Sequence, residues 1–97
     1  MALQIVNAGR GAGTGEPASP AEIAEQIRRA IAEALPEAAI EVRPQGPGHF
    51  EIAVTDAVFA GKPRVRQQQL VYAAITHLMA GANPPVHAVD RLDCRVP

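Results

Sequence analysis

Residues 49–96 decide the fold, because they read in turn as a strand, a helix and a second strand. The first part, residues 49–55, is HFEIAVT and alternates apolar with polar side chains, which is typical of a half-buried strand. The middle part, residues 64–79, is RVRQQQLVYAAITHLM and predicts a helix with one apolar stripe. The last part, residues 86–96, is VHAVDRLDCRV and predicts another strand. Two strands of one sheet that are joined by a crossover helix run parallel, so this stretch predicts a βαβ unit.

The last strand contains an irregularity. Asp90 falls on the same side as Ala88 and Leu92, so a charged residue interrupts the apolar face. A β-bulge near Asp90–Arg91 would shift the alternation by one residue and repair its phase. We therefore expect a bulge at that point.

A helix and a strand precede this unit. Ser19-Pro20-Ala21-Glu22 predicts a helix start, because Ser and Glu at this spacing form a capping box and Pro suits the first helical position. An apolar stripe follows at intervals of four residues, and Pro36 ends the helix. The residues of this stripe are Ile23, Ile27, Ile31 and Leu35. Residues 40–43 alternate as a strand, and the Pro- and Gly-rich residues 44–48 predict the turn of a hairpin with residues 49–55.

The resulting order, α-β-β-α-β, predicts an α+β fold. We expect a two-layer sandwich in which a three-stranded mixed sheet carries both helices on one face. A chain of 97 residues has room for one such domain, which we place at residues 19–97. Residues 1–18 are rich in small residues and are interpreted as a flexible N-terminal lead, although residues 3–6 could also pair as a short strand.

The composition limits the classes of function. Nine Lys and Arg residues nearly balance ten Asp and Glu residues, so the net charge of −1 attracts neither nucleic acid nor an anionic membrane. The single cysteine excludes an internal disulfide and favours the reducing cytoplasm. No apolar run reaches the roughly 20 residues of a membrane span, and the N-terminus lacks the pattern of a secretory signal. No nucleophile–base–acid set is apparent, so we expect a binding protein and not an enzyme.

Two histidines lie near the starts of the two parallel strands. His49 opens one strand and His87 nearly opens the other. The starts of parallel neighbours lie at one edge of a sheet about 5 Å apart, so the two imidazoles could converge there. Imidazole binds zinc, iron and copper, but two histidines make a weak site, and a partner would have to supply the remaining ligands. The alternative is a half-buried His87 that bonds to a backbone carbonyl.

The remaining histidine and the cysteine are weaker candidates. His77 lies on the polar side of the second helix and is expected to be solvated. Cys94 lies in a strand, where a lone cysteine is more often a small buried hydrophobe than a thiolate ligand.

Four segments, taken in order and with their spacing, resemble the BolA family over about residues 20–97. The segments are HF at 49–50, FAGK at 59–62, RVRQQQLVY at 64–72 and VHAV at 86–89. The pattern Arg-Val-x-x-Gln-Gln at the start of the second helix resembles the acid-stress branch of the family, whereas Arg-His-Arg is more typical of BolA itself.

The resemblance implies a fold similar to a type II KH domain and a partnership with a monothiol glutaredoxin. The two proteins would share a [2Fe–2S] cluster, with thiolates from the glutaredoxin and from glutathione, in iron–sulfur or iron homeostasis or a stress response. The BolA-like ligands correspond here to His87 in the last strand and His49 after the first strand. Neutral imidazole carries less negative charge than thiolate, so such ligation would raise the reduction potential of the cluster.

The sequence departs from the family pattern in three places. Gln67, Gln68 and Gln69 stand where Arg-His-Arg is more typical, which removes positive charge. Residues 90–91 insert one residue after VHAV, in agreement with the expected bulge. The usual Thr-Pro-x-x-Trp ending is missing, so we expect the partner contacts of that tail to be altered or absent.

The competing interpretation is a KH-like, nucleic-acid-binding transcriptional regulator. Lys62, Arg64 and Arg66 lie close together at the start of the second helix, where three cations and the helix N-terminus could hold phosphates. The sequence has no Gly-x-x-Gly loop between its helices and no obvious aromatic face for base stacking, so a solvated helix end, or contact with an acidic partner protein, is favoured over DNA binding.

Overall fold

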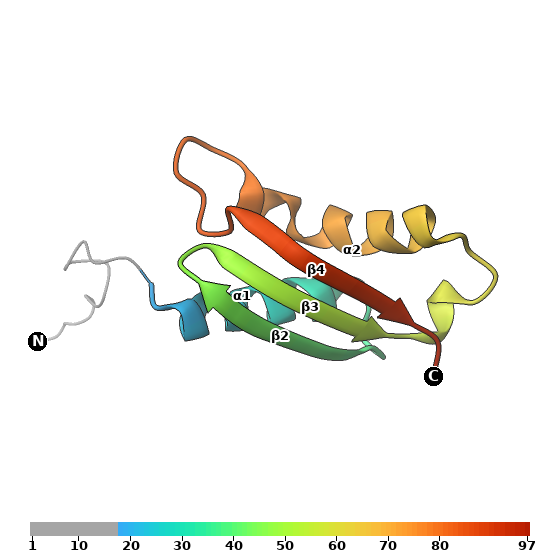
Figure 1. The fold of residues 1–97 in the computed structure, drawn as a ribbon. Helices are drawn as coiled ribbons and strands as arrows, with labels where there is room; N and C mark the ends of the chain where they lie inside the picture. The colour runs from blue at the N-terminus through green and yellow to red at the C-terminus, as the bar shows by residue number, and fades with distance from the viewer. Residues whose placement is uncertain (1–17) are drawn as a thin grey trace, which may run out of the picture.

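The computed structural model describes residues 18–97, which fold in the order helix, strand, strand, helix, strand (Figure 1). The elements are α1 (Pro20–Ala34), β2 (Ala39–Gly46), β3 (His49–Thr55), the short 3-10 helix η3 (Ala57–Phe59), α2 (Arg64–Met79) and β4 (Ala88–Arg95). The predicted α-β-β-α-β order is confirmed. The flexible lead predicted at residues 1–18 lies outside the described residues, except for Ala18. The possible strand at residues 3–6 lies outside them entirely.

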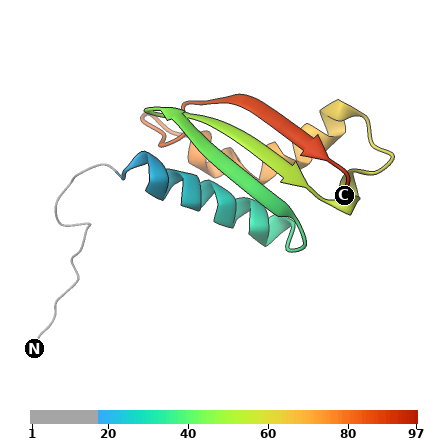
Figure 2. The same cartoon turned by 60° about the horizontal axis from the view of Figure 1, so that its bottom comes forward.

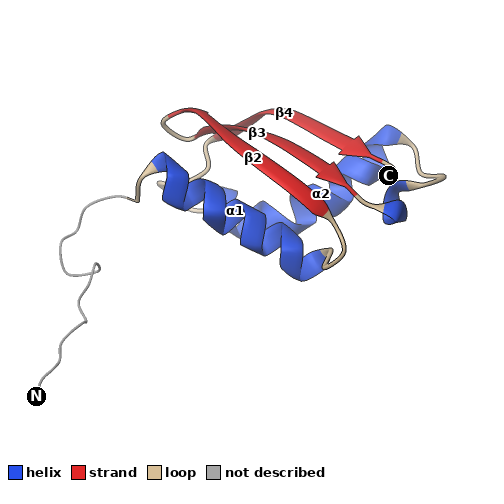
Figure 3. Ribbon diagram, turned by 90° about the horizontal axis from the view of Figure 1, so that it is seen from below, coloured by secondary structure: helices blue, strands red, loops and turns tan. Residues whose placement is uncertain are grey.

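The three strands form one mixed sheet in the order β2-β3-β4. β2 pairs with β3 in the antiparallel sense and β4 pairs with β3 in the parallel sense, as a hairpin followed by a crossover helix requires. Both helices cover the same face of the sheet (Figures 2 and 3). The predicted α+β two-layer sandwich is therefore confirmed, and the described residues leave the other face of the sheet open.

The core fills the space between the sheet and the two helices. β3 is the central strand, and its alternate residues Phe50, Ile52 and Val54 are at most 2% exposed. Fully buried residues of α1 and α2 pack against them, and burial of each such side chain contributes about 1.5–3 kcal/mol. These helix residues are Ile27, Ile31, Val71 and Ile75.

The start of α1 has the capping box that the sequence predicts. The Glu22 backbone N–H donates to Ser19 Oγ at 3.2 Å, and the Ser19 backbone N–H donates to Glu22 Oε1 at 2.7 Å. The two bonds satisfy donors that a helix start otherwise leaves without partners. They fix the start of α1 beside the β2–β3 turn, where the candidate site lies.

Two strand boundaries differ from the prediction. β2 continues through Pro44 to Gly46, so the turn predicted for residues 44–48 contains only residues 47 and 48. β2 is an edge strand, where proline is tolerated, and the register shifts between Pro44 and Gly46. β4 begins at Ala88 and not at Val86, because Val86 is fully buried beneath the sheet and its N–H donates to the carbonyl of Leu78.

No helix within residues 18–97 combines the length and the apolar character needed to span a bilayer.

Candidate functional site

The turn between β2 and β3 is the centre of one end of the sheet. Gly48 has a φ of 78°, in the left-handed region that glycine adopts readily. Its carbonyl accepts two backbone hydrogen bonds, from the N–H of His87 at 2.8 Å and from the N–H of Ala88 at 3.0 Å. These bonds attach the start of β4 to the turn.

His87 lies directly over this glycine. A Cβ atom on Gly48 would lie 2.2 Å from His87 Cδ2, so the ring occupies space that any other side chain at position 48 would fill. The residue is exposed, and within residues 18–97 its ring nitrogens have no hydrogen-bond partner. The ring therefore does not make the carbonyl bond of the alternative interpretation.

An apolar hollow of about 470 Å³ opens beside His87. Its other walls come from the start of α1, the β2–β3 turn and the connection between α2 and β4. These walls include Pro20, Ile23, Pro47, Asn83, Pro84 and Pro85. Clefts of this size and character commonly receive a ligand or a side chain of a partner.

His49 opens β3, and Asp90 of β4 holds its ring. His49 Nδ1 lies 2.9 Å from Asp90 Oδ1, and the side chains are 49% and 42% exposed. Asp90 is the extra residue of a bulge, because the register on β4 passes from Val89 to Arg91 across consecutive residues of β3. The bulge predicted near residues 90–91 is confirmed.

The two imidazoles lie at the same end of the sheet but on opposite faces. Successive strand residues point to opposite faces, and Phe50 points to the helices, so His49 points to the open face. The His87 ring lies instead on the helix side, in the hollow that Ile23 of α1 helps to line. The structure brings the two histidines to neighbouring backbone positions but does not bring their rings into one hollow.

The donor set at this end is incomplete as a metal site. Within residues 18–97 no group of three or more His, Cys, Asp or Glu side chains is arranged to hold a metal ion. A metal shell that includes His49 or His87 therefore needs ligands from another molecule.

Sequence reasoning missed the role of Asp90. The sequence predicted a bulge at this position from the broken alternation, but it did not indicate which side chain the extra residue would contact. The available signal was that the inserted residue is an aspartate, which can bond to a histidine, and that its strand neighbours the strand of His49. The contact itself depends on the register of β3 and β4.

The three candidate cations lie at the opposite end of the sheet. Lys62, Arg64 and Arg66 form no ion pair with any described carboxylate, whereas the other five described Lys and Arg side chains each lie within 4.0 Å of one. The sequence contains no Asp or Glu between Asp56 and Asp90. The three cations at the start of α2 are therefore available to an anionic partner.

The structure divides these cations between two sides of α2. Lys62 and Arg66 line one shallow hollow together with Gln69, and Lys62 Nζ donates to the carbonyl of Val58 at 2.8 Å. Arg64 lines a different pocket, between α2 and β4. The predicted cluster is close in sequence, but it does not form one continuous track.

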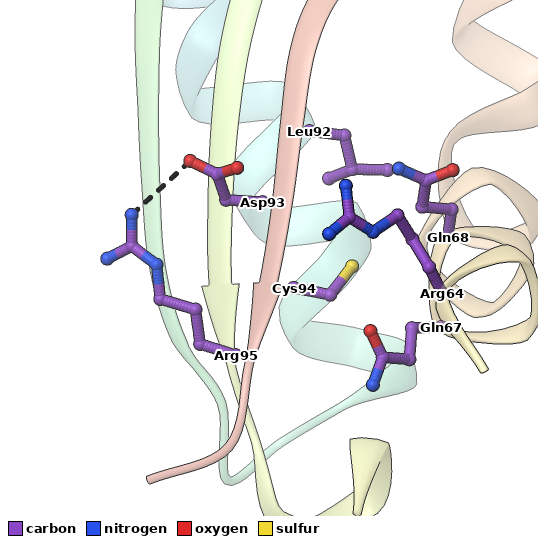
Figure 4. A pocket seen from close by; sticks show the side chains of 7 residues that line it. All are labelled: Arg64, Gln67, Gln68, Leu92, Asp93, Cys94 and Arg95. Atoms are coloured by element: carbon purple, nitrogen blue, oxygen red, sulfur yellow. Dashed lines mark hydrogen bonds and ion pairs between the residues drawn. The ribbon is translucent and has the colours of Figure 1, made fainter. Parts of the chain in front are cut away.

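The pocket that contains Arg64 also contains Cys94. It has a volume of about 130 Å³, and the Cys94 side chain points from β4 toward α2, where Gln67 and Gln68 lie (Figure 4). Burial, with a smaller contribution from the charge of Asp93, raises the pKa of the Cys94 thiol. A raised pKa favours the neutral thiol over the thiolate that metals and electrophiles require.

His77 lies in the last turn of α2 and is exposed, as predicted.

Comparisons with known proteins give consistent results. A family described as "BolA-like protein" matches residues 26–94. An uncharacterized protein of the rpoN-murA intergenic region of Acinetobacter guillouiae is 37% identical over 65 residues, which cover 67% of this chain and 75% of that protein. The solution structure of BolA1 from Mus musculus is similar with a TM-score of 0.64 and 28% identity, over 98% of this chain and 78% of that one. The BolA domain of SufE1 from Arabidopsis thaliana shares the fold, with a TM-score of 0.63 and 23% identity over 77% and 92% of the two chains.

Proposed function

Since the chain belongs to the BolA-like family, we propose that it binds a monothiol glutaredoxin and contributes imidazole to a [2Fe–2S] cluster that the two proteins share. Glutaredoxin and glutathione thiolates supply the other ligands. The role is that of a cytoplasmic binding partner in iron–sulfur or iron homeostasis or the response to stress.

The observation that carries this proposal is the environment of His87. The ring is exposed at the wall of an apolar hollow, and no described residue bonds to its nitrogens. Gly48 leaves the space in which the ring rests, so the histidine is positioned by packing while its nitrogens stay available. An imidazole in this state fits the requirement of a metal ligand that completes a shell begun by a partner.

His49 is the second proposed ligand, and its environment fits in a different way. Asp90 occupies its Nδ1, which leaves Nε2 as the atom that can bind a metal. Because the two rings flank the β2–β3 turn on opposite faces, a partner that reaches both must cover the end of the sheet. Imidazole ligation at either position would give the bound cluster a higher reduction potential than four thiolates.

Reconstitution with a partner tests the proposal. The protein is mixed with a monothiol glutaredoxin, glutathione, iron and sulfide, and visible circular dichroism is recorded. We expect the wild type to change the spectrum of the glutaredoxin cluster and His87→Ala to lose that change. His77→Ala removes an exposed histidine that does not line the hollow beside His87 and should behave as the wild type. A spectrum that the wild type leaves unchanged would refute the proposal.

A second function, nucleic-acid binding, is favoured by one observation, the three cations at the start of α2 that pair with no carboxylate among residues 18–97. Their division between two sides of α2, and the complete burial of Phe50 and Phe59, argue against a phosphate track with base stacking. We therefore prefer the glutaredoxin proposal.

DNA retardation at several salt concentrations decides between the two. If nucleic acid binds, changing Arg64 and Arg66 to Gln should lower the slope of log K against log[salt] by about 0.7–0.9 for each phosphate that the protein no longer neutralises. Arg28→Gln with Arg29→Gln is the matched control, because both arginines pair with Glu25. Retardation that is absent, or equal in the two double variants, excludes a specific role for the unpaired cations.

A further inference from the structure

The bulge in β4 changes which residue faces Glu51. In a regular ladder Asp90 would take the position opposite Glu51, and two carboxylates would oppose each other. With the bulge, Arg91 pairs with Glu51, and Leu92 returns to the helix side opposite Ile52. Asp90 is left without an opposite residue in the register of β3.

The freed side chain bonds to His49 on the open face of the sheet. An ionised carboxylate can only accept a hydrogen bond, so the hydrogen in the 2.9 Å contact between Asp90 Oδ1 and His49 Nδ1 belongs to the imidazole. A neutral ring with its hydrogen on Nδ1 carries its lone pair on Nε2. No described residue bonds to Nε2 of His49.

We propose that Asp90 is a positioning residue that fixes the His49 ring in its Nδ1–H tautomer and presents a bare Nε2 on the open face of the sheet. This inference deepens the proposed function, because it assigns the ligating atom of the second histidine and the group that selects it. Bulges are uncommon in parallel strand pairs and often lie next to functional sites, where they redirect a side chain. Here the inserted residue Asp90 orients the side chain of His49 on the neighbouring strand.

The tautomer is measurable in the protein alone, so the test does not depend on a glutaredoxin or a cluster. Protein labelled with ¹⁵N is studied in alkaline buffer, where imidazoles are neutral, by long-range ¹H–¹⁵N correlation of the histidine rings. We expect His49 to show the Nδ1–H pattern in the wild type. We expect Asp90→Ala to lose that pattern and to resemble His77 and His87, whose rings have no described hydrogen bond.

Asp93→Ala is the matched control. It removes a carboxylate from the same strand, but Asp93 pairs with Arg91 and Arg95 and not with His49. The His49 pattern should therefore persist in this variant. An Nε2–H pattern for His49 in the wild type overturns the inference even if Asp90→Ala fails to fold, and so does an Nδ1–H pattern that survives in a folded Asp90→Ala protein.

The two proposals fail separately. If the tautomer changes as expected but the wild type leaves the glutaredoxin cluster unaltered, the shared cluster is refuted and the role of Asp90 toward His49 stands. If the cluster forms but the tautomer of His49 does not depend on Asp90, the positioning role is refuted and the proposed function stands on His87.

Discussion

The two ends of the sheet are built from the same three strands but differ in how their polar groups are held. At the histidine end, the two-residue turn between β2 and β3 lies beside the start of β4. The His87 ring packs on this turn, and no hydrogen bond joins the ring to it. At the cation end, the connection from β3 to α2 is held by several side-chain bonds, and Lys62 donates to a backbone carbonyl. The comparison shows that the His87 ring is held by packing and keeps its nitrogens available, whereas the Gln67 and Lys62 side chains at the cation end are committed to hydrogen bonds with backbone carbonyls.

Substitution of the glycine at each end is expected to have the largest effect on stability. Gly48 and Gly61 have nearly equal φ values, 78° and 77°, but a Cβ would collide with His87 at position 48 and meet nothing within 4 Å at position 61. We expect Gly61→Ala to lower the free energy of unfolding by about 1–3 kcal/mol from backbone strain alone. We expect Gly48→Ala to cost more and to displace the His87 ring.

Urea denaturation of both variants measures the free energies, and the ring signals of His87 report the displacement. If Gly48→Ala is no more destabilising than Gly61→Ala, and the His87 signals do not move, the ring does not rest on the turn.

The starts of the two helices give a sharper test of the cation end. α1 has a capping box, but α2 begins after Pro63 without a side-chain cap. Gln67 stabilises this start instead, because its Nε2 donates to the carbonyls of Phe59 at 3.0 Å and Lys62 at 3.1 Å. We expect Gln67→Ala to lower the free energy of unfolding by about 1 kcal/mol.

Thermal or urea unfolding checks this expectation, with the exposed Gln69→Ala as its control. Equal stability of the two variants would show that the bonds of Gln67 do not hold the connection.

The smallest expected effect is a pH dependence from α1. A hydrogen bond from Arg28, with a further bond from Arg29, lowers the pKa of Glu25 to about 2 from an ordinary value of 4.5. A carboxylate whose pKa is lower in the folded state stabilises the fold above the unfolded-state pKa, and this contribution is lost as the pH falls from about 4.5 toward 2. Because Glu25 is exposed, solvent keeps the contribution small.

Urea unfolding between these two pH values measures the effect. Glu25→Gln should reduce the pH dependence of stability in this window without changing the dependence above it. A wild-type and variant pair with the same pH profile would contradict the assignment.

Local patterns in the sequence predicted most of the fold. The capping box at Ser19, the apolar stripe of α1 and the alternation in residues 49–55 each reflect a physical period, so they indicated the elements and the buried face. The bulge was predictable because Asp90 breaks an alternation of period two. The strand boundaries were less predictable, because the edge position that tolerates Pro44 is a property of the sheet.

The candidate site was predicted in part. Parallel strand starts share an edge, so the neighbouring positions of His49 and His87 followed from the order of the elements. The sequence did not place the two rings on opposite faces of that end, because the faces depend on the register of β4 against β3.

The sequence by itself determined the helices, the strands, the parallel crossover and the residues that face the core, because these follow from periodicity and chain connectivity. Tertiary structure alone decided that Asp90 bonds to His49 and that Gly48 makes room for His87. The physical reason is that each of these contacts joins residues from separate segments of the chain, and their distances are set only when the sheet and the helices pack together.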